Sequence, residues 1–124
     1  MKKKKKILIV EDDRPLVKII LRTLNSGKFD IILAGESDEA IKKALVEKPD
    51  LIVLDILLPG KDGFNCLKEL KQQPRLKNIP VMILSNLGQQ EEIRRGLELG
   101  AVDYMIKADF SVSQIADKLA KYLK

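Results

Sequence analysis

Short apolar runs alternate with longer segments of helical periodicity along the whole chain, and this alternation restricts the possible folds more than any other feature. The apolar runs occupy residues 6–10, 29–34, 51–54, 81–84 and 104–106. Each is followed by apolar residues spaced three or four apart, which is typical of an amphipathic helix. We therefore expect a doubly wound α/β domain with a five-stranded parallel sheet. The flavodoxin-like strand order 2-1-3-4-5 is the natural candidate for such a (βα)5 chain, and it brings the ends of the 6–10 and 51–54 strands together.

The ends of the expected helices carry capping residues. Asp13 and Ser37 are expected N-caps, and Ser111 with Gln114 forms a capping box for the last helix. Gly100 follows the 89–99 helix at the position where a left-handed backbone is common. The helix after the first strand is expected to end at residues 25–27, and the helix after the third strand at Pro74. The side chains expected to face the core are Leu16, Ile19, Ile20 and Leu24, then Ala40, Ile41, Ala44 and Leu45, then Phe64, Leu67 and Leu70, then Ile93 and Leu97, and finally Ile115, Leu119 and Tyr122 or Leu123.

Length and composition exclude several classes of protein. A chain of 124 residues suits one domain, and its 45% apolar and 33% charged content suits a soluble globular protein. No apolar run approaches the roughly 20 residues that a membrane helix needs. The single Cys66 cannot form an internal disulfide, and nothing resembles a signal peptide, so we expect a cytoplasmic setting. Because the chain has no histidine, a Ser-His-Asp triad and a histidine metal site are both excluded.

The net charge of +5 resides at the beginning of the chain. Residues 2–6 are five consecutive lysines, so the charges of the other residues cancel. We expect a basic leader at 1–6 and one domain at 7–124, with the leader a solvated segment that discourages edge-to-edge pairing. Such a leader can also touch phosphates or acidic lipids through weak, salt-sensitive attraction. We expect no direct nucleic-acid binding and no membrane association.

Polar residues follow four of the expected strands. Glu11 and Asp12 follow the first, Asp55 the third, Ser85 the fourth and Lys107 the fifth. Carboxylates that meet at one edge of a sheet repel one another unless a cation lies among them, and an all-oxygen set suits Mg²⁺. A carboxylate can also accept a phosphoryl group, with a cation and a hydroxyl to hold it. Each residue taken singly also fits an ordinary turn, cap or solvated position, and only their convergence favours metal and phosphate chemistry.

At these residues the chain resembles the receiver domain of two-component response regulators, of the single-domain chemotaxis or sporulation type. The resemblance extends from Ile7 to Leu123. It is carried by Val10 to Asp13, by Asp55 with Pro59 and Gly63, by Ser85 and Asn86, by Gly100 and Ala101, and by Tyr104 to Lys107.

The resemblance implies a role for each of these side chains. Asp55 would be the phospho-acceptor. Mg²⁺ would be bound directly by Asp12, through water by Glu11, and by the Leu57 backbone carbonyl. Ser85 and Lys107 would bind the phosphoryl group, and Tyr104 would move with Ser85 as a switch. The phosphoryl group would come from a histidine kinase or a phosphotransfer protein in a phosphorelay. The surface of helix 89–99, strand 104–106 and the last helix would then change shape for a downstream protein partner, in a monomer or weak dimer. The resemblance implies Mg²⁺-dependent self-phosphorylation and slow autodephosphorylation rather than a turnover enzyme.

Two features depart from the family pattern. Ala108 follows Lys107 where a proline is usual, and a cis bond before a non-proline residue costs about 2.5–4 kcal/mol, so we expect a trans peptide and a reshaped loop at 108–110. In that loop Asp109 could pair with Lys107. Leu57 and Leu87 are apolar where receivers with fast hydrolysis tend to carry polar side chains. We therefore expect a long-lived phosphoryl-aspartate, unless the two leucines only pack.

Three other functional classes compete with a signalling receiver. A pseudo-receiver would share the fold without being phosphorylated, and only the missing proline favours it. A haloacid-dehalogenase-like phosphatase would need a second aspartate at position 57, which is leucine. Nucleotide binding is disfavoured because neither a Walker motif nor a Gly-x-Gly-x-x-Gly pattern follows any strand.

Overall fold

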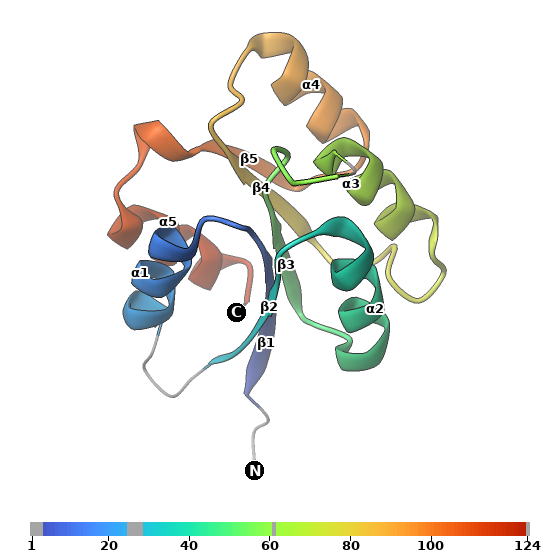
Figure 1. Ribbon diagram of the computed structural model, residues 1–124, viewed down its shortest axis with the longest axis horizontal. Helices are drawn as coiled ribbons and strands as arrows, with labels where there is room; N and C mark the ends of the chain where they lie inside the picture. Colours follow the sequence, from blue (N-terminus) through green and yellow to red (C-terminus); the bar gives the residue numbers. More distant parts are fainter. Residues whose placement is uncertain (1–3, 25–28, 61, 124) are drawn as a thin grey trace.

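The computed structural model describes residues 4–24, 29–60 and 62–123, in which strands and helices alternate throughout (Figure 1). The strands are β1 (Lys5–Val10), β2 (Phe29–Ala34), β3 (Leu51–Leu54), β4 (Val81–Ser85) and β5 (Asp103–Ile106). The helices are α1 (Arg14–Leu24), α2 (Ser37–Glu47), α3 (Gly63–Gln72), α4 (Gln90–Glu98) and α5 (Val112–Lys121), and a short 3-10 turn, η1 (Lys107–Asp109), follows β5. Each expected strand and helix is present, with ends that differ by one or two residues. The expected helix end at 25–27, and Lys2 and Lys3 of the leader, lie outside the described residues.

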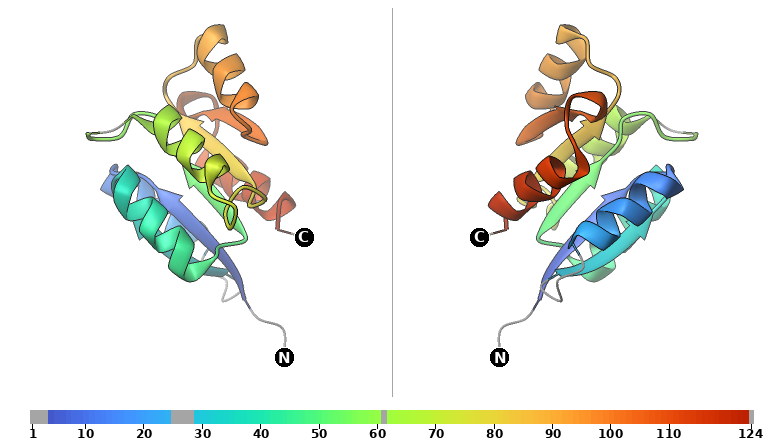
Figure 2. Two further views of the ribbon diagram at one scale, coloured as in Figure 1. Left: turned by 90° about the vertical axis from the view of Figure 1, so that its right-hand side faces the viewer. Right: turned by 90° about the vertical axis from the view of Figure 1, so that its left-hand side faces the viewer.

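The strands form one parallel sheet in the order β2-β1-β3-β4-β5, as predicted. Helices α1 and α5 cover one face, and α2, α3 and α4 lie on the other (Figures 1 and 2). Because all strands are parallel, the loops that lead from a strand to the next helix gather at the carboxyl edge of the sheet. The loops that lead from a helix to the next strand gather at the opposite, amino edge.

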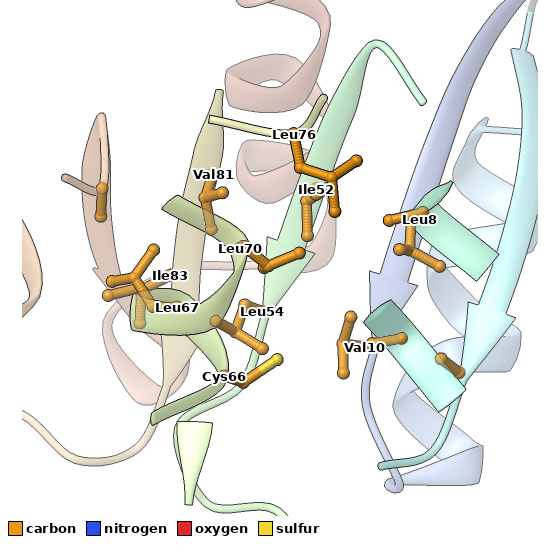
Figure 3. Close-up of a cluster of buried hydrophobic side chains, with 14 of the residues drawn as sticks. Leu8, Val10, Ile52, Leu54, Cys66, Leu67, Leu70, Leu76, Val81 and Ile83 are labelled. Atoms are coloured by element: carbon orange, nitrogen blue, oxygen red, sulfur yellow. The ribbon is translucent and has the colours of Figure 1, made fainter. Parts of the chain in front are cut away.

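Alternate residues of the central strands face opposite sides of the sheet, so each strand contributes to two cores. On one side, Leu8, Ile52 and Ile83 pack against Leu67 and Leu70 of α3 and its neighbours (Figure 3). On the other side, the intervening strand residues pack against α1 and α5, through Ile7, Ile9, Leu51, Val53, Met82, Leu84, Met105, Ile20, Leu24, Ile115, Leu119 and Leu123. Strands β3 and β4 are buried at every residue. Their continuous apolar sequences are therefore explained by burial on both faces.

Most of the predicted helix ends are confirmed, with one correction. The Asp13 carboxylate accepts a hydrogen bond from the Leu16 N–H at 3.2 Å, and the box of Ser111 and Gln114 is present. Gly100 has a φ of +111°, as expected for its position after α4. The prediction that Ser37 caps α2 is wrong. Glu36 is the N-cap, because its carboxylate accepts from the Glu39 N–H at 3.0 Å, and Ser37 is instead the first residue of the helix.

Two residues expected in the core are exposed. Ile19 is 44% exposed because the buried stripe of α1 follows Val17, Ile20 and Leu24, which leaves Ile19 on the flank of the helix. Leu97 is 46% exposed because α4 approaches the sheet through Gly96 instead. Within the described residues, no helix is sufficiently long and apolar to cross a membrane.

Candidate functional site

The carboxyl ends of β1 and β3 are neighbours at the centre of the sheet. Val10 is paired with Leu54, and the Asp55 N–H donates to the Val10 carbonyl at 3.0 Å. On the other side of β1, the Glu11 N–H donates to the Ala34 carbonyl at 2.9 Å. These backbone bonds extend the ladders one residue beyond the strands. They fix the positions from which the side chains of Glu11 and Asp55 project.

Glu11, Asp12 and Asp55 form a carboxylate cluster at this edge. One oxygen from each lies within 4.8 Å of the others, and Glu11 and Asp55 are buried whereas Asp12 is exposed. When all three carboxylates are ionised, they carry three negative charges, and with the single positive charge of Lys107 the group has a net charge of −2. Carboxylate oxygens with an open, solvated side fit a hard divalent cation such as Mg²⁺.

Lys107 reaches into the cluster from the end of β5. Its ammonium lies 2.9 Å from Asp55 Oδ2 and 2.5 Å from Glu11 Oε1, and its side chain is 14% exposed. No cis peptide bond occurs in the described part of the chain, so the predicted trans bond before Ala108 is confirmed. The reshaped segment is the η1 turn. Replacement of the usual proline by Ala108 therefore does not prevent Lys107 from reaching Asp55, and the partners of Lys107 are these two carboxylates rather than Asp109.

Burial and charge together shift the proton affinities of the site. Burial raises the pKa of Glu11 to about 7, the Asp55 carboxylate adds to this rise, and the hydrogen bond from Lys107 opposes it. Burial alone would lower the pKa of Lys107, but its bonds to Glu11 and Asp55 outweigh that effect and raise it. Lys107 therefore remains a cation at neutral pH.

The loop after Asp55 is closely packed against the start of α3. The Leu57 N–H donates to Asp55 Oδ1 at 3.0 Å, and Gly60 has a φ of +77°. A Cβ on Gly63 would lie 2.4 Å from the Ile56 Cα and 2.5 Å from the Asp55 carbonyl oxygen. Only glycine fits there without moving the backbone that holds Asp55. Leu57 itself is 53% exposed, so its side chain does not serve the core.

Ser85 and Tyr104 belong to a second group, centred on the β4–α4 loop. Ser85 is fully buried at the end of β4, and its Oγ accepts from the Leu87 N–H at 3.3 Å. The Tyr104 hydroxyl donates to the Leu87 carbonyl. Burial raises the pKa of Tyr104 to about 12, with the charges of Glu92 and Asp55 contributing. The structure therefore brings Glu11, Asp12, Asp55 and Lys107 together, while the hydrogen bonds of Ser85 and Tyr104 are to the adjacent loop.

Contacts around α4 were not expected from the sequence. A Cβ on Gly96 would lie 2.6 Å from the Ile83 Cδ1 and 3.0 Å from the Tyr104 ring, so α4 lies directly on that ring. The Arg95 guanidinium lies 4.4 Å from the centroid of the Phe64 ring and links α4 to α3. A glycine inside a helical pattern usually has a packing reason, and that signal at Gly96 would have identified the contact.

Comparisons with known proteins agree on one family. The model for the response regulator receiver domain matches residues 7–120. The alkaline phosphatase synthesis transcriptional regulatory protein PhoP of Bacillus subtilis is 40% identical over 97% of this chain, which covers 49% of that protein. The phosphate regulon transcriptional regulatory protein PhoB of Escherichia coli is 34% identical over 97% of this chain and 52% of its own length. The BeF3-activated N-terminal receiver domain of Klebsiella pneumoniae RstA has a TM-score of 0.86 at 32% identity and covers 97% of this chain and 99% of that chain. The chain thus spans about half the length of the curated relatives it matches.

Proposed function

The chain belongs to the family of response regulator receiver domains, and from this premise we propose that it accepts a phosphoryl group on Asp55 from a histidine kinase or phosphotransfer protein. The observation that carries the proposal is the buried Asp55 carboxylate, held by the Lys107 ammonium at 2.9 Å beside Glu11 and Asp12. Such a carboxylate is a fixed nucleophile in a site built for negative charge. In this reading the chain is a cytoplasmic signalling module in a phosphorelay rather than a turnover enzyme.

In the transfer step, an Asp55 carboxylate oxygen attacks the phosphorus atom of a phosphohistidine. The new O–P bond forms as the N–P bond breaks, and the imidazole nitrogen leaves with the bonding electron pair and takes up a proton. The Lys107 ammonium neutralises negative charge on the phosphoryl oxygens. Little conformational entropy is lost in orienting it, because Asp55 and Glu11 already hold it in place.

Glu11, Asp12 and Asp55 fit Mg²⁺, with the Leu57 carbonyl as a further ligand. A bound Mg²⁺ would supply charge neutralisation and alignment of the phosphoryl oxygens. Asp12 is the exposed member of the cluster. An open cavity of about 710 Å³ lies beside Glu11 and Asp12 and is bordered by Arg14 and Lys18.

Phosphorylation would be transmitted through the β4–α4 loop. A phosphoryl group adds about −1.5 to −2 charge and strong acceptor oxygens at Asp55. The Ser85 hydroxyl, now bonded only within its own loop, would turn toward these oxygens. Since Tyr104 donates to the Leu87 carbonyl of the same loop, its ring would move as well and alter the α4, β5 and α5 surface for a protein partner. That partner is either a separate protein or a further domain of the protein that contains this chain.

The experiment that tests acceptance is intact-mass measurement after incubation with acetyl phosphate and Mg²⁺. The unaltered chain should gain one phosphoryl group, and Asp55→Asn should gain none. Asp62→Asn is the matched control, because Asp62 is an exposed carboxylate seven residues away and asparagine can still cap α3. Equal labelling of Asp55→Asn and the unaltered chain would refute the assignment. Absence of labelling in all three would instead favour a pseudo-receiver.

We also propose that the phosphoryl group is long-lived. Leu57 and Leu87 offer no polar group to orient an attacking water molecule. Leu57→Asn, at a position 53% exposed, should shorten the lifetime about tenfold without harming the fold. Loss of label by the unaltered chain within seconds in Mg²⁺, with no phosphatase present, would contradict the proposal.

A further inference from the structure

The two edges of the sheet carry opposite charge. At the carboxyl edge, the loops of the described residues are mostly acidic and contain Glu11, Asp12, Asp13, Glu36, Asp55, Asp62 and Asp109, with Lys107 among them. At the amino edge, the start of β1 and the loops that lead into strands are mostly basic and contain Lys4, Lys5, Lys48, Arg75 and Lys77, with Asp50 among them. The two edges lie at opposite ends of the strands (Figures 1 and 2). The molecule therefore has a basic end opposite the acceptor site.

A shallow cavity of about 450 Å³ lies at this basic end. Residues 4–6, 46–48 and Asp50 line it. Its two acids are already engaged, because Glu47 pairs with the Lys6 ammonium at 3.4 Å and Asp50 accepts from the Lys6 N–H at 2.8 Å. By contrast, the ammonium groups at 4, 5 and 48 have no ion-pair partner in the described part of the chain. In the sequence, Lys2 and Lys3 directly precede this group. Four ammonium groups thus face two carboxylates in the lining of this cavity, which leaves an excess of two positive charges.

Although no membrane association was expected from the sequence, we propose that the basic pole, defined as Lys4, Lys5, Lys48 and Val46, binds the surface of an anionic phospholipid bilayer. Clustered lysines are attracted by anionic lipid headgroups, each by roughly a factor of five in affinity. Val46 lies among them and is 78% exposed, which gives the pole an aliphatic side chain that can enter the headgroup region.

The composition of the pole favours lipid over nucleic acid. The cavity is lined by no arginine for paired contacts with phosphate and by no aromatic ring for base stacking. An exposed valine adds no binding energy to a complex with a phosphate backbone, whereas burial of its side chain at the headgroup region of a bilayer is favourable. Because the acceptor site is at the opposite edge, a receiver held at the bilayer by this pole would present Asp55 to the solvent. Lipid binding and phosphorylation would then be independent of each other.

The test is co-sedimentation with vesicles of phosphatidylcholine alone and of phosphatidylcholine mixed with phosphatidylglycerol, at low salt. The unaltered chain should sediment only with the mixed vesicles, and it should be released at about 1 M salt, where the screening length falls to about 3 Å. The triple variant Lys4→Gln, Lys5→Gln, Lys48→Gln should bind about a hundredfold more weakly. Val46→Ser alone should weaken binding about fivefold.

The matched control removes the same charge elsewhere, through Lys42→Gln, Lys68→Gln and Arg94→Gln, three exposed positions on α2, α3 and α4. It should retain binding to within about threefold. Every position changed in the two triple variants is exposed, and circular dichroism checks the fold. Equal loss in both triple variants would overturn the proposal, because net charge rather than this pole would then explain binding. Sedimentation no better with mixed vesicles than with phosphatidylcholine would overturn it too, as would tighter binding to duplex DNA with no effect of Val46→Ser.

Discussion

The pH at which the Tyr104 hydroxyl ionises measures how closely α4 and the β4–α4 loop enclose this side chain. The chain has two tyrosines and no tryptophan, so Tyr122→Phe leaves Tyr104 as the only phenol. Burial raises the pKa of Tyr104 to about 12 from an ordinary value of 10.0. At pH 11 an ordinary phenol is about nine-tenths ionised, whereas Tyr104 should be only about one-tenth ionised.

The assay is absorbance of the phenolate near 295 nm between about pH 9 and 12.5, with far-ultraviolet circular dichroism recorded on the same samples to confirm the fold. Glu92→Gln should lower the midpoint, because the charge of Glu92 is the second contributor to the shift and glutamine can still accept from the Gln89 N–H. A folded Tyr122→Phe protein whose phenol titrates near pH 10 would refute the reasoning. Such a value would place the ring in water rather than against Gly96.

The same shift determines how stability depends on pH. An unfolded chain releases the Tyr104 proton from about pH 10, while the folded chain retains it to about 12. Protons are therefore bound more tightly in the folded state over this window, and the free energy of unfolding should fall as the pH rises through it. Tyr104→Phe should reduce this dependence. What remains comes from Tyr122 and Lys107, whose pKa values are also raised, and is opposed by Lys71, whose pKa burial lowers.

Three further substitutions test other parts of the structure. Ser37→Ala should leave the free energy of unfolding unchanged or raise it by up to about 1 kcal/mol, because Ser37 Oγ is buried without a hydrogen-bond partner among the described residues. Glu36→Ala should lower the free energy of unfolding by about 1 kcal/mol through loss of the cap. Urea unfolding compares the two variants, and a large loss in Ser37→Ala would contradict the structure. Gly96→Ala gains about 1 kcal/mol of helix propensity but places a Cβ 2.6 Å from the Ile83 Cδ1. Thermal unfolding should therefore show that the free energy of unfolding falls by about 1 kcal/mol. A rise in the free energy of unfolding would mean that α4 shifts freely. Lys107→Gln should tighten Mg²⁺ binding about tenfold or more in a calorimetric titration, because it removes the cation beside Glu11 and Asp55. An unchanged Mg²⁺ affinity would show that Lys107 does not compete with the metal.

The strands and helices could be predicted because their patterns are local in sequence. The order of the sheet is not local, and it was predicted because 2-1-3-4-5 is a common order for a (βα)5 chain. The placement of Asp55 beside Glu11 follows from that order, in which the first and third strands are neighbours. The chemistry of phosphoryl transfer then follows from the residue types at the strand ends. A resemblance to receiver domains added the individual roles of Ser85 and Tyr104.

Side-chain preferences that depend on tertiary packing could not be predicted. Ser37 is a good N-cap by type, but the carboxylate of the preceding Glu36 accepts from the Glu39 N–H, so the helix begins at Ser37, one residue earlier than a Ser37 cap predicted. Leu97 has the spacing of a core residue, yet α4 lies on the Tyr104 ring through Gly96, and Leu97 is 46% exposed. The exposure of Leu97 follows from the fit between α4 and that ring, which periodicity alone does not describe.

The manner in which α4 is attached has a consequence for the order in which the molecule comes apart. Gly96 is the only buried residue of this helix, whereas α3 buries five of its residues, so α4 loses little apolar contact when it separates from the sheet. The glycine also weakens the helix itself by about 0.5–1 kcal/mol relative to alanine. Local opening should therefore begin at α4 while the two cores persist. Among the helices, α4 should therefore exchange its amide protons earliest.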